Sequence, residues 1–128
     1  AAALAAAAGL AAGAVALAPA DGLAARAQYG ARPDVQTLAA NKLTRRAATL
    51  NGLVGPNNNQ TGVRFQWGPT RRYGRTALVG VIGRRVPLRR VKARIAGLKP
   101  GKLYHFRVVA SSRAGVSRGA DRTFRTLR

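Results

Sequence analysis

The sequence has no cysteine, no glutamate and only three aspartates: Asp21, Asp34 and Asp121. Without cysteine there is no disulfide, no thiol nucleophile and no cysteine-based metal site, so a folded domain must be held by packing alone. Against the three acids stand 23 lysines and arginines, which gives a formal net charge of +20. Most cations therefore have no carboxylate partner within the chain. A field of this strength favours polyanions and makes copies of the chain repel one another.

Arginine supplies 19 of the 23 basic side chains, and two interpretations of that choice stay open. Guanidinium groups recognise phosphate and carboxylate through two parallel hydrogen bonds, which suits a binding surface. A GC-rich genome also raises arginine together with alanine, glycine and proline, as in this sequence.

Residues 1–27 resemble the apolar part of a secretory signal peptide whose beginning is truncated. Positions 1–20 carry no charge and are dominated by alanine. Small-x-small cleavage patterns follow at Ala18-Pro19-Ala20 and at Ala25-Arg26-Ala27. The alternative is an uncleaved membrane anchor, because twenty residues are long enough to span a bilayer. Only in that case do we expect contact with a membrane. Residues 28–33 are expected to form a linker, the end of a short flexible lead-in.

Residues 34–128 show short apolar segments separated by turn residues, the pattern of an all-β sandwich. We expect Val63, Phe65 and Trp67 to point inward by alternation, and Tyr73 to be the most exposed aromatic side chain. The fifth segment alternates in two registers, which a β-bulge at Arg89-Arg90 would reconcile. The expected strands cover 34–40, 47–54, 62–68, 76–82 and 84–95, then a strand starting near residue 104 and a closing turn and strand within 114–126.

A loop followed by a strand stands out at residues 96–110. Leu98 is an apolar plug before the turn at Pro100-Gly101, where proline presets φ and glycine is free to take a positive φ. Tyr104 opens the next strand, and alternate residues after it are apolar. We expect Leu98, Pro100, Gly101, Tyr104 and the inward Trp67 to determine the fold.

These motifs together resemble bacterial exported fibronectin type III-like domains. An A-T-L-N-G strand occupies 48–52, and Phe65-Gln66-Trp67-Gly68-Pro69-Thr70 followed by Tyr73-Gly74 is similar to the family's next strand and turn. Trp67 stands where tyrosine is more usual, and Pro69 is inserted. The resemblance implies an immunoglobulin-like β-sandwich of about seven strands, in which the Tyr104 hydroxyl returns to the preceding loop. It also implies a non-catalytic extracellular or cell-surface module, a spacer or adhesive unit whose partners are other extracellular proteins.

Catalytic constellations are missing from the sequence. The single histidine, His105, is expected to point outward as a solvated side chain. There are no paired carboxylates, no nucleophile–base pair, no metal-ligand spacing and no phosphate-binding glycine loop. We therefore expect no enzyme activity, no cofactor and no small-molecule substrate.

The candidate binding residues include a series of basic side chains along one strand, here called the basic ladder. Arg90, Lys92 and Arg94 are expected on one outer strand face, about 7 Å apart. The other expected members are Arg84, Arg85, Arg89 and Arg107, with Arg71, Arg72 and Arg75 in a nearby turn. Such a surface could bind cell-wall polymers, acidic glycans or nucleic acid. The alternative is a solvated face that protects the sheet from aggregation. Nucleic-acid binding is disfavoured because no exposed aromatics lie between the cations.

Overall fold

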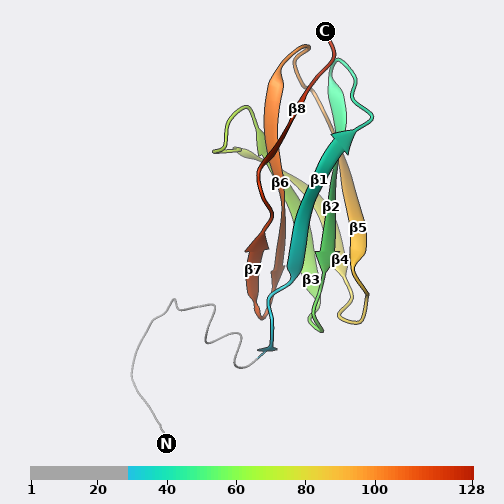
Figure 1. Ribbon diagram of the computed structural model, residues 1–128, viewed down its shortest axis with the longest axis vertical. Helices are drawn as coiled ribbons and strands as arrows, with labels where there is room; N and C mark the ends of the chain where they lie inside the picture. Colours follow the sequence, from blue (N-terminus) through green and yellow to red (C-terminus); the bar gives the residue numbers. More distant parts are fainter. Residues whose placement is uncertain (1–28) are drawn as a thin grey trace, which may run out of the picture.

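The computed structural model describes residues 29–128, so the signal-like segment 1–27 lies outside the described residues. Two antiparallel β-sheets are packed face to face (Figure 1). No helix in the described part of the chain is long and apolar enough to cross a membrane. The strands are β1 (Asp34–Asn41), β2 (Ala47–Gly55), β3 (Thr61–Gly68), β4 (Arg75–Ile82), β5 (Arg89–Ala96), β6 (Leu103–Ser112), β7 (Gly115–Arg118) and β8 (Arg122–Arg125).

The smaller sheet, sheet A, has the strand order β1-β2-β5. The larger one, sheet B, has the order β4-β3-β6-β7, and β8 also pairs with β6. The chain enters the sandwich at one end of β1, and its C-terminus lies at the opposite end of the molecule (Figure 1). The all-β sandwich expected from the sequence is confirmed, and the first four strands fall within one residue of their expected bounds.

The expected last strand is divided into β7 and β8, and Gly119 marks the break. Its backbone N–H donates to the carbonyl oxygen of Val108 at 2.8 Å. A Cβ at this position would overlap the hydroxyl of Thr37, a buried side chain of β1. The chain passes closely around Thr37 at this point, which requires glycine and interrupts the ladder.

The bulge expected at Arg89-Arg90 is wrong. β5 begins only at Arg89 and pairs with β2 without a register shift, from Val54 opposite Arg89 to Ala47 opposite Ala96. Residues 84–88 form the turn before the strand, so their apolar side chains follow no strand alternation. The irregularities lie elsewhere, between Leu38 and Asn41 in β1 and opposite the Val63–Arg64 step of β3.

The core between the sheets is built around a group of aromatic rings. Tyr104 stacks on Phe124 with ring centroids 5.5 Å apart, and Trp67 meets Tyr104 edge-on at 6.0 Å. Phe65 and Phe106 are fully buried beside them. Such pairs add stabilisation beyond the burial of their apolar area. Because these rings face inward as expected, they do not form a surface for stacking sugars or bases.

The expected tyrosine corner is present between β5 and β6. The backbone N–H of Lys99 donates to the Tyr104 hydroxyl oxygen at 2.9 Å. Leu98 is buried beneath this loop. Gly101 has a φ of +64°, which favours glycine at the turn. The Gly101 N–H donates to the carbonyl oxygen of Leu127, so the corner also fixes the end of the chain.

Residues 29–33, expected as part of a linker, lie against the loop between β2 and β3. The side-chain amide of Asn59 donates to the Tyr29 carbonyl oxygen at 2.9 Å, and that of Asn57 donates to the Arg32 carbonyl oxygen at 2.6 Å. The guanidinium of Arg113 lies over the Tyr29 ring, 4.9 Å from its centroid. The segment that leads into β1 is therefore attached to the domain.

The sheets approach closely at Gly52, which gives a first prediction. A Cβ at Gly52 would lie 3.1 Å from Val108 Cβ and 3.3 Å from a backbone oxygen. We expect Gly52→Ala to lower the free energy of unfolding by about 1–3 kcal/mol, because overpacking forces the sheets apart. Urea denaturation measures it. Gly62→Ala is the matched control, since its Cβ would meet only one atom, at 4.0 Å. Equal effects of the two changes would contradict the close approach.

The corner gives a second prediction. Tyr104→Phe removes the hydroxyl that accepts from Lys99 and should cost on the order of 1 kcal/mol of unfolding free energy. Tyr29→Phe is the control, because the Tyr29 hydroxyl makes no hydrogen bond within residues 29–128. Denaturation curves of Tyr104→Phe that overlay those of the unchanged protein would remove the corner from the interactions that stabilise the fold.

Candidate polyanion-binding face

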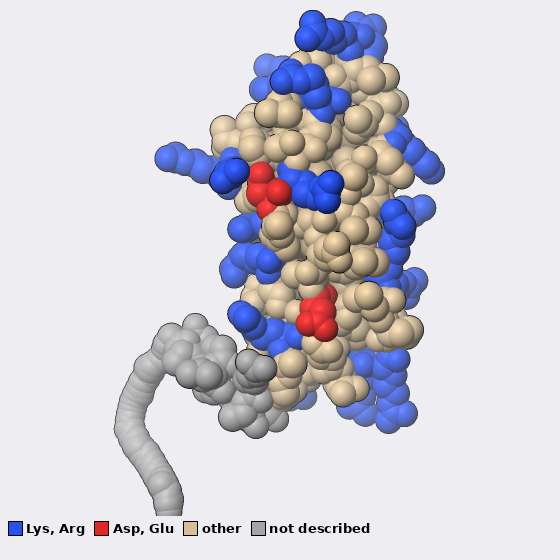
Figure 2. All heavy atoms as spheres, viewed as in Figure 1, with Lys and Arg blue, Asp and Glu red and all other residues tan. Residues whose placement is uncertain are grey.

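The outer face of sheet A carries the basic ladder on β5. Arg90 lies opposite Leu53 of β2, Lys92 opposite Asn51, and Arg94 opposite Thr49. The three cations are exposed, whereas Val91 and Ile95, on the opposite alternation of the strand, are buried in the core. In Figure 2 lysine and arginine side chains follow the edge of the molecule where Figure 1 places β5. Strand alternation thus brings these cations to one side of the domain.

The ladder is not neutralised by the protein. Within residues 29–128, the side chains of Arg90 and Lys92 take part in no hydrogen bond, ion pair or cation–π contact. Arg94 is held by neutral groups, because its Nη1 donates to the Lys42 carbonyl oxygen and to the Thr49 hydroxyl, each at 3.2 Å. The ion pairs of the described chain both involve Asp121, on the other sheet. The positive charge of this face is therefore open to solvent and its counterions.

A hollow of about 370 Å³ lies beside the ladder where β1 ends. The register shift between Leu38 and Asn41 ends regular pairing, and Lys42 follows with a φ of +49°. The Asn51 side-chain amide fixes this shape by donating to the Ala39 carbonyl oxygen at 3.0 Å and to Asn41 Oδ1 at 3.1 Å. The lining residues are Asn41, Lys42, Thr49, Asn51, Arg90 and Lys92.

Lys42 was absent from the residues expected at the site. The sequence placed it in the turn just after the first strand, 48 positions before Arg90, and a turn lysine is ordinarily a solvated side chain. Only the pairing of β1 and β5 on either side of β2 brings Lys42 to the ladder. A positive residue directly after the first strand was the one available signal.

Arg84, Arg85 and Arg89 lie at one end of the ladder. Arg84 and Arg85 are exposed on the turn between β4 and β5, where they line a hollow that also includes Asp34. Arg89 stands opposite Val54, in the inward register, but is exposed because it begins the strand. These three residues therefore adjoin the outer face and do not continue its alternation.

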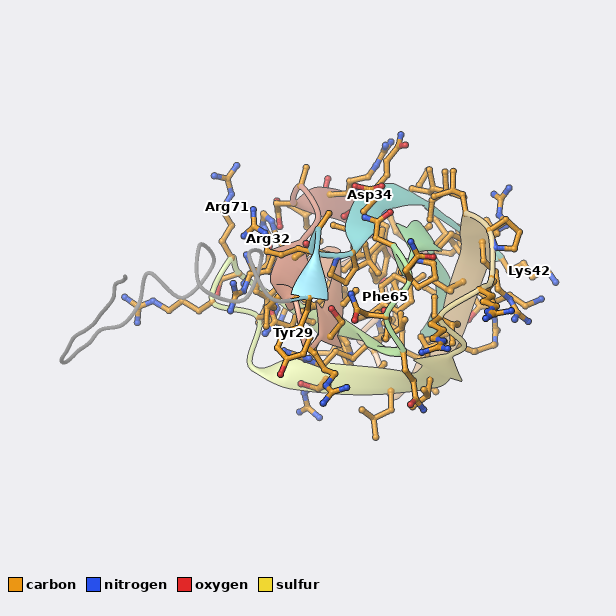
Figure 3. All side chains as sticks on the ribbon, turned by 90° about the horizontal axis from the view of Figure 1, so that it is seen from below. Tyr29, Arg32, Asp34, Lys42, Phe65 and Arg71 are labelled. Carbon is orange, nitrogen blue, oxygen red and sulfur yellow. The ribbon has the colours of Figure 1, made fainter. Side chains whose placement is uncertain are left out.

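Arg107 was expected with the ladder, but the structure places it on the outer face of sheet B. Its Nε donates to Gln66 Oε1 at 2.7 Å, and its guanidinium lies 4.7 Å from the centroid of the Tyr73 ring. The turn with Arg71 is also distant: Figure 3 shows Arg71 and Lys42 on opposite sides of the molecule, with Phe65 between the sheets. The sequence prediction grouped these residues with the ladder because all of them were expected on outward or turn positions. The outer faces of the two sheets point in opposite directions, so outward residues of different sheets do not meet.

Tyr73 and His105 both differ from expectation. Tyr73, expected as the most exposed aromatic, is 9% exposed and donates to Asp121 Oδ1 at 2.8 Å. His105, expected to be solvated, lies with Nδ1 2.9 Å from Asp121 Oδ2 and with only 18% of its side chain exposed. Arg71 adds a contact to the same oxygen at 3.6 Å. Asp121 thus collects three partners on sheet B.

Burial alone would raise the pKa of Asp121, but hydrogen bonds from His105 and Tyr73 and the charges of His105 and Arg71 outweigh it and lower that pKa. For Tyr73, burial and the hydrogen bond to Asp121 raise the pKa. No hydroxyl nucleophile is hydrogen-bonded to His105 in residues 29–128. In the same range, no group of three or more His, Cys, Asp or Glu residues could hold a metal. This cluster joins the turn between β3 and β4, strand β6 and the segment that leads into β8.

The contribution of the Asp121 carboxylate to stability depends on pH, which gives a third prediction. Because the folded state lowers the pKa of Asp121 below its ordinary value of 3.8, the carboxylate adds stability above about pH 4 that is lost as the pH falls through the lowered pKa. The difference in unfolding free energy between the unchanged protein and Asp121→Asn should therefore shrink below pH 4. Asp34→Asn, which changes a carboxylate without a hydrogen bond or ion pair in residues 29–128, should show no comparable trend. A difference for Asp121→Asn that stays constant from pH 3 to 7 would contradict the assignment.

Comparison with known proteins finds similarity in solved structures alone. No family model matches the sequence, and no curated protein matches it. A sensor domain of the anti-sigma factor RsgI4 from Pseudobacteroides cellulosolvens is 19% identical with a TM-score of 0.58, over 76% of this chain and 96% of that chain. The sixth fibronectin type III domain of human fibronectin type III domain containing protein 3 is 24% identical with a TM-score of 0.53, over 74% and 86%.

A third similar structure is the fibronectin type III domain of the human KIAA0970 protein. It is 19% identical with a TM-score of 0.50, over 73% of this chain and 72% of that chain. Identities at this level establish the fold and carry no function across. Together with the two sheets and the tyrosine corner, they show that the described residues adopt the fibronectin type III fold.

Proposed function

We propose that this domain is a non-catalytic interaction module of an exported protein and that the outer face of sheet A binds anionic polymers. One observation carries the second part. Arg90 and Lys92 stand exposed on alternate positions of one strand with no carboxylate partner within residues 29–128. A polyanion that docks there releases its own counterions, and no ion pair of the protein has to break first.

The spacing of the ladder suits a linear polymer. Alternate residues on a strand are about 7 Å apart, so an extended chain with repeating anions can meet Arg90, Lys92 and Arg94 in succession. Acidic glycans and phosphate-containing cell-wall polymers have this character. Nucleic acid fits less well, because the aromatic residues of β3, β6 and β8 are buried in the core and give bases nothing to stack on.

Two features support the non-catalytic role in an exported protein. The Asp121–His105 pair is occupied by Tyr73 and Arg71 and serves the packing of sheet B. Export rests on the sequence of residues 1–27, whose apolar stretch and small-x-small patterns suit a signal peptide. The similar RsgI4 domain is a sensor domain, which agrees with recognition as a role for this fold.

A spacer is the second candidate. The chain enters at one end of the sandwich and its C-terminus lies at the other, so neighbouring segments would be held apart by the length of the domain (Figure 1). In that role the partners are other extracellular proteins, and the basic face keeps the exposed sheet from aggregating.

Retention on an anionic polymer separates the two candidates and gives a fourth prediction. We compare Arg90→Gln/Lys92→Gln/Arg94→Gln with Arg72→Gln/Arg118→Gln/Arg122→Gln, a control that removes the same charge from exposed positions outside sheet A. On immobilised heparin, the slope of log retention against log salt should fall by about one per cation removed from the β5 face, and by less for the control.

Thermal unfolding of both triple variants checks that the fold is kept. Equal losses of retention would mean that only net charge acts, and the β5 face would then have no special role. Elution of the unchanged protein well below physiological salt would leave the spacer as the better account.

A further inference from the structure

The hollow beside the ladder is a formed recess with a polar floor, which distinguishes it from a flat patch of cations. Asn41 and Lys42, which follow the register shift in β1, form one side of its rim. Arg94 ties this rim to β5 by donating to the Lys42 carbonyl oxygen. The three strands of sheet A therefore share in holding its shape.

The floor consists of Asn51 and Thr49, which are 3% and 5% exposed. The Nδ2 group of Asn51 donates hydrogen bonds to Ala39 and Asn41 of β1. Its Oδ1 accepts no hydrogen bond within residues 29–128. Because no completely buried side-chain oxygen in that range lacks a partner, this Oδ1 keeps some contact with solvent, although Asn51 as a whole is 3% exposed. The Thr49 hydroxyl oxygen accepts from Arg94, so its own hydrogen remains available.

The walls consist of Lys42, Arg90 and Lys92. Lysine is rare in this chain, with four residues against 19 arginines, yet two of the four line this hollow. An ammonium group is compact and donates in three rotatable directions, so it can adapt to a small anionic group in a confined space. The walls thus offer positive donors, and the floor offers one acceptor and one hydroxyl.

We infer that this hollow, here called the Lys42 pocket, binds a single acidic sugar unit of an anionic glycan. The inference rests on the proposed function and names the class of polymer. The sugar carboxylate would be held by Lys42, Arg90 and Lys92, and its ring hydroxyls would donate to Asn51 Oδ1 and accept from Thr49. Charge-assisted hydrogen bonds of this kind are the strong ones in carboxylate recognition.

The open oxygen of Asn51 is what separates a sugar from a phosphate chain. A carbonyl oxygen accepts hydrogen bonds and repels an anionic oxygen placed against it. Polyphosphate and the phosphates of a nucleic acid offer acceptors there and no donor, whereas an acidic sugar brings hydroxyl hydrogens beside its carboxylate. The floor therefore favours the glycan at the point where the cations alone would not discriminate.

The test titrates tetragalacturonate, and separately linear tetraphosphate, into the full ¹⁵N-labelled chain and follows amide shifts by NMR. With tetragalacturonate we expect the largest shifts at Lys42, Thr49 and Asn51. Lys42→Gln should weaken its binding about five- to tenfold, the loss of one charged hydrogen-bond donor. Lys99→Gln, which removes the same charge outside the pocket, should change it less than twofold.

Thr49→Val tests the floor separately from the charge. It should weaken tetragalacturonate about three- to fivefold, as one hydrogen bond is lost. Equal affinities for Lys42→Gln and Lys99→Gln, with retention on heparin still dependent on the β5 face, would overturn the pocket and keep the proposed function. Tetraphosphate binding as tight as tetragalacturonate, with the same shifts, would overturn the glycan assignment. If the unchanged protein were not retained on heparin at physiological salt, both the pocket and the proposed function would be overturned.

Discussion

The two sheets are held together chiefly by apolar packing, because the chain has no cysteine to link them. Because side chains alternate along a strand, packing one face against the other sheet also decides which residues face solvent. On β2 the buried series that includes Leu50 and Val54 faces β6, and Gly52 leaves room for Val108. Residues between those positions have to face outward. The close packing of the core therefore also decides where the cations lie, and on β5 it places Arg90, Lys92 and Arg94 on one outer face.

The two outer faces differ in how their charge is compensated. On sheet B, Asp121 gathers Tyr73, His105 and Arg71, and Arg107 is engaged by Gln66 and the Tyr73 ring. Figure 2 shows the acidic side chains as two small groups on the viewed surface, whereas cations border it on several sides. On sheet A the ladder meets only neutral partners. Asp121 lies on the side of sheet B, and Asp34, at the start of β1 in sheet A, forms no ion pair with the ladder within residues 29–128. The ladder therefore stays uncompensated, and this asymmetry is the basis of the proposed binding face.

Local patterns predicted most of the fold and part of the candidate site. The inward Phe65 and Trp67 and the corner at Tyr104 followed from alternation and turn chemistry, which act over a few residues. Arg90, Lys92 and Arg94 followed from the same alternation. Tyr73 was misjudged because its burial depends on Asp121, 48 positions later in the chain, and no local pattern reports such a contact. The bulge expected in β5 is absent because residues 84–88 form a turn, although in the sequence Val86 and Leu88 follow the alternation of a strand.

The sequence by itself determined that this is a cysteine-free β-sandwich with inward aromatics, a tyrosine corner and a strongly basic surface, since composition and the two-residue strand period are local properties. Only the tertiary structure decided which cations act together. It brought Lys42 to Arg90 and Lys92 across β2, and it moved Arg107 to the opposite face. The physical reason is that strands distant in sequence become neighbours when the two sheets form. Their order, and the bulge that shapes the recess, are settled by the packing of the whole domain.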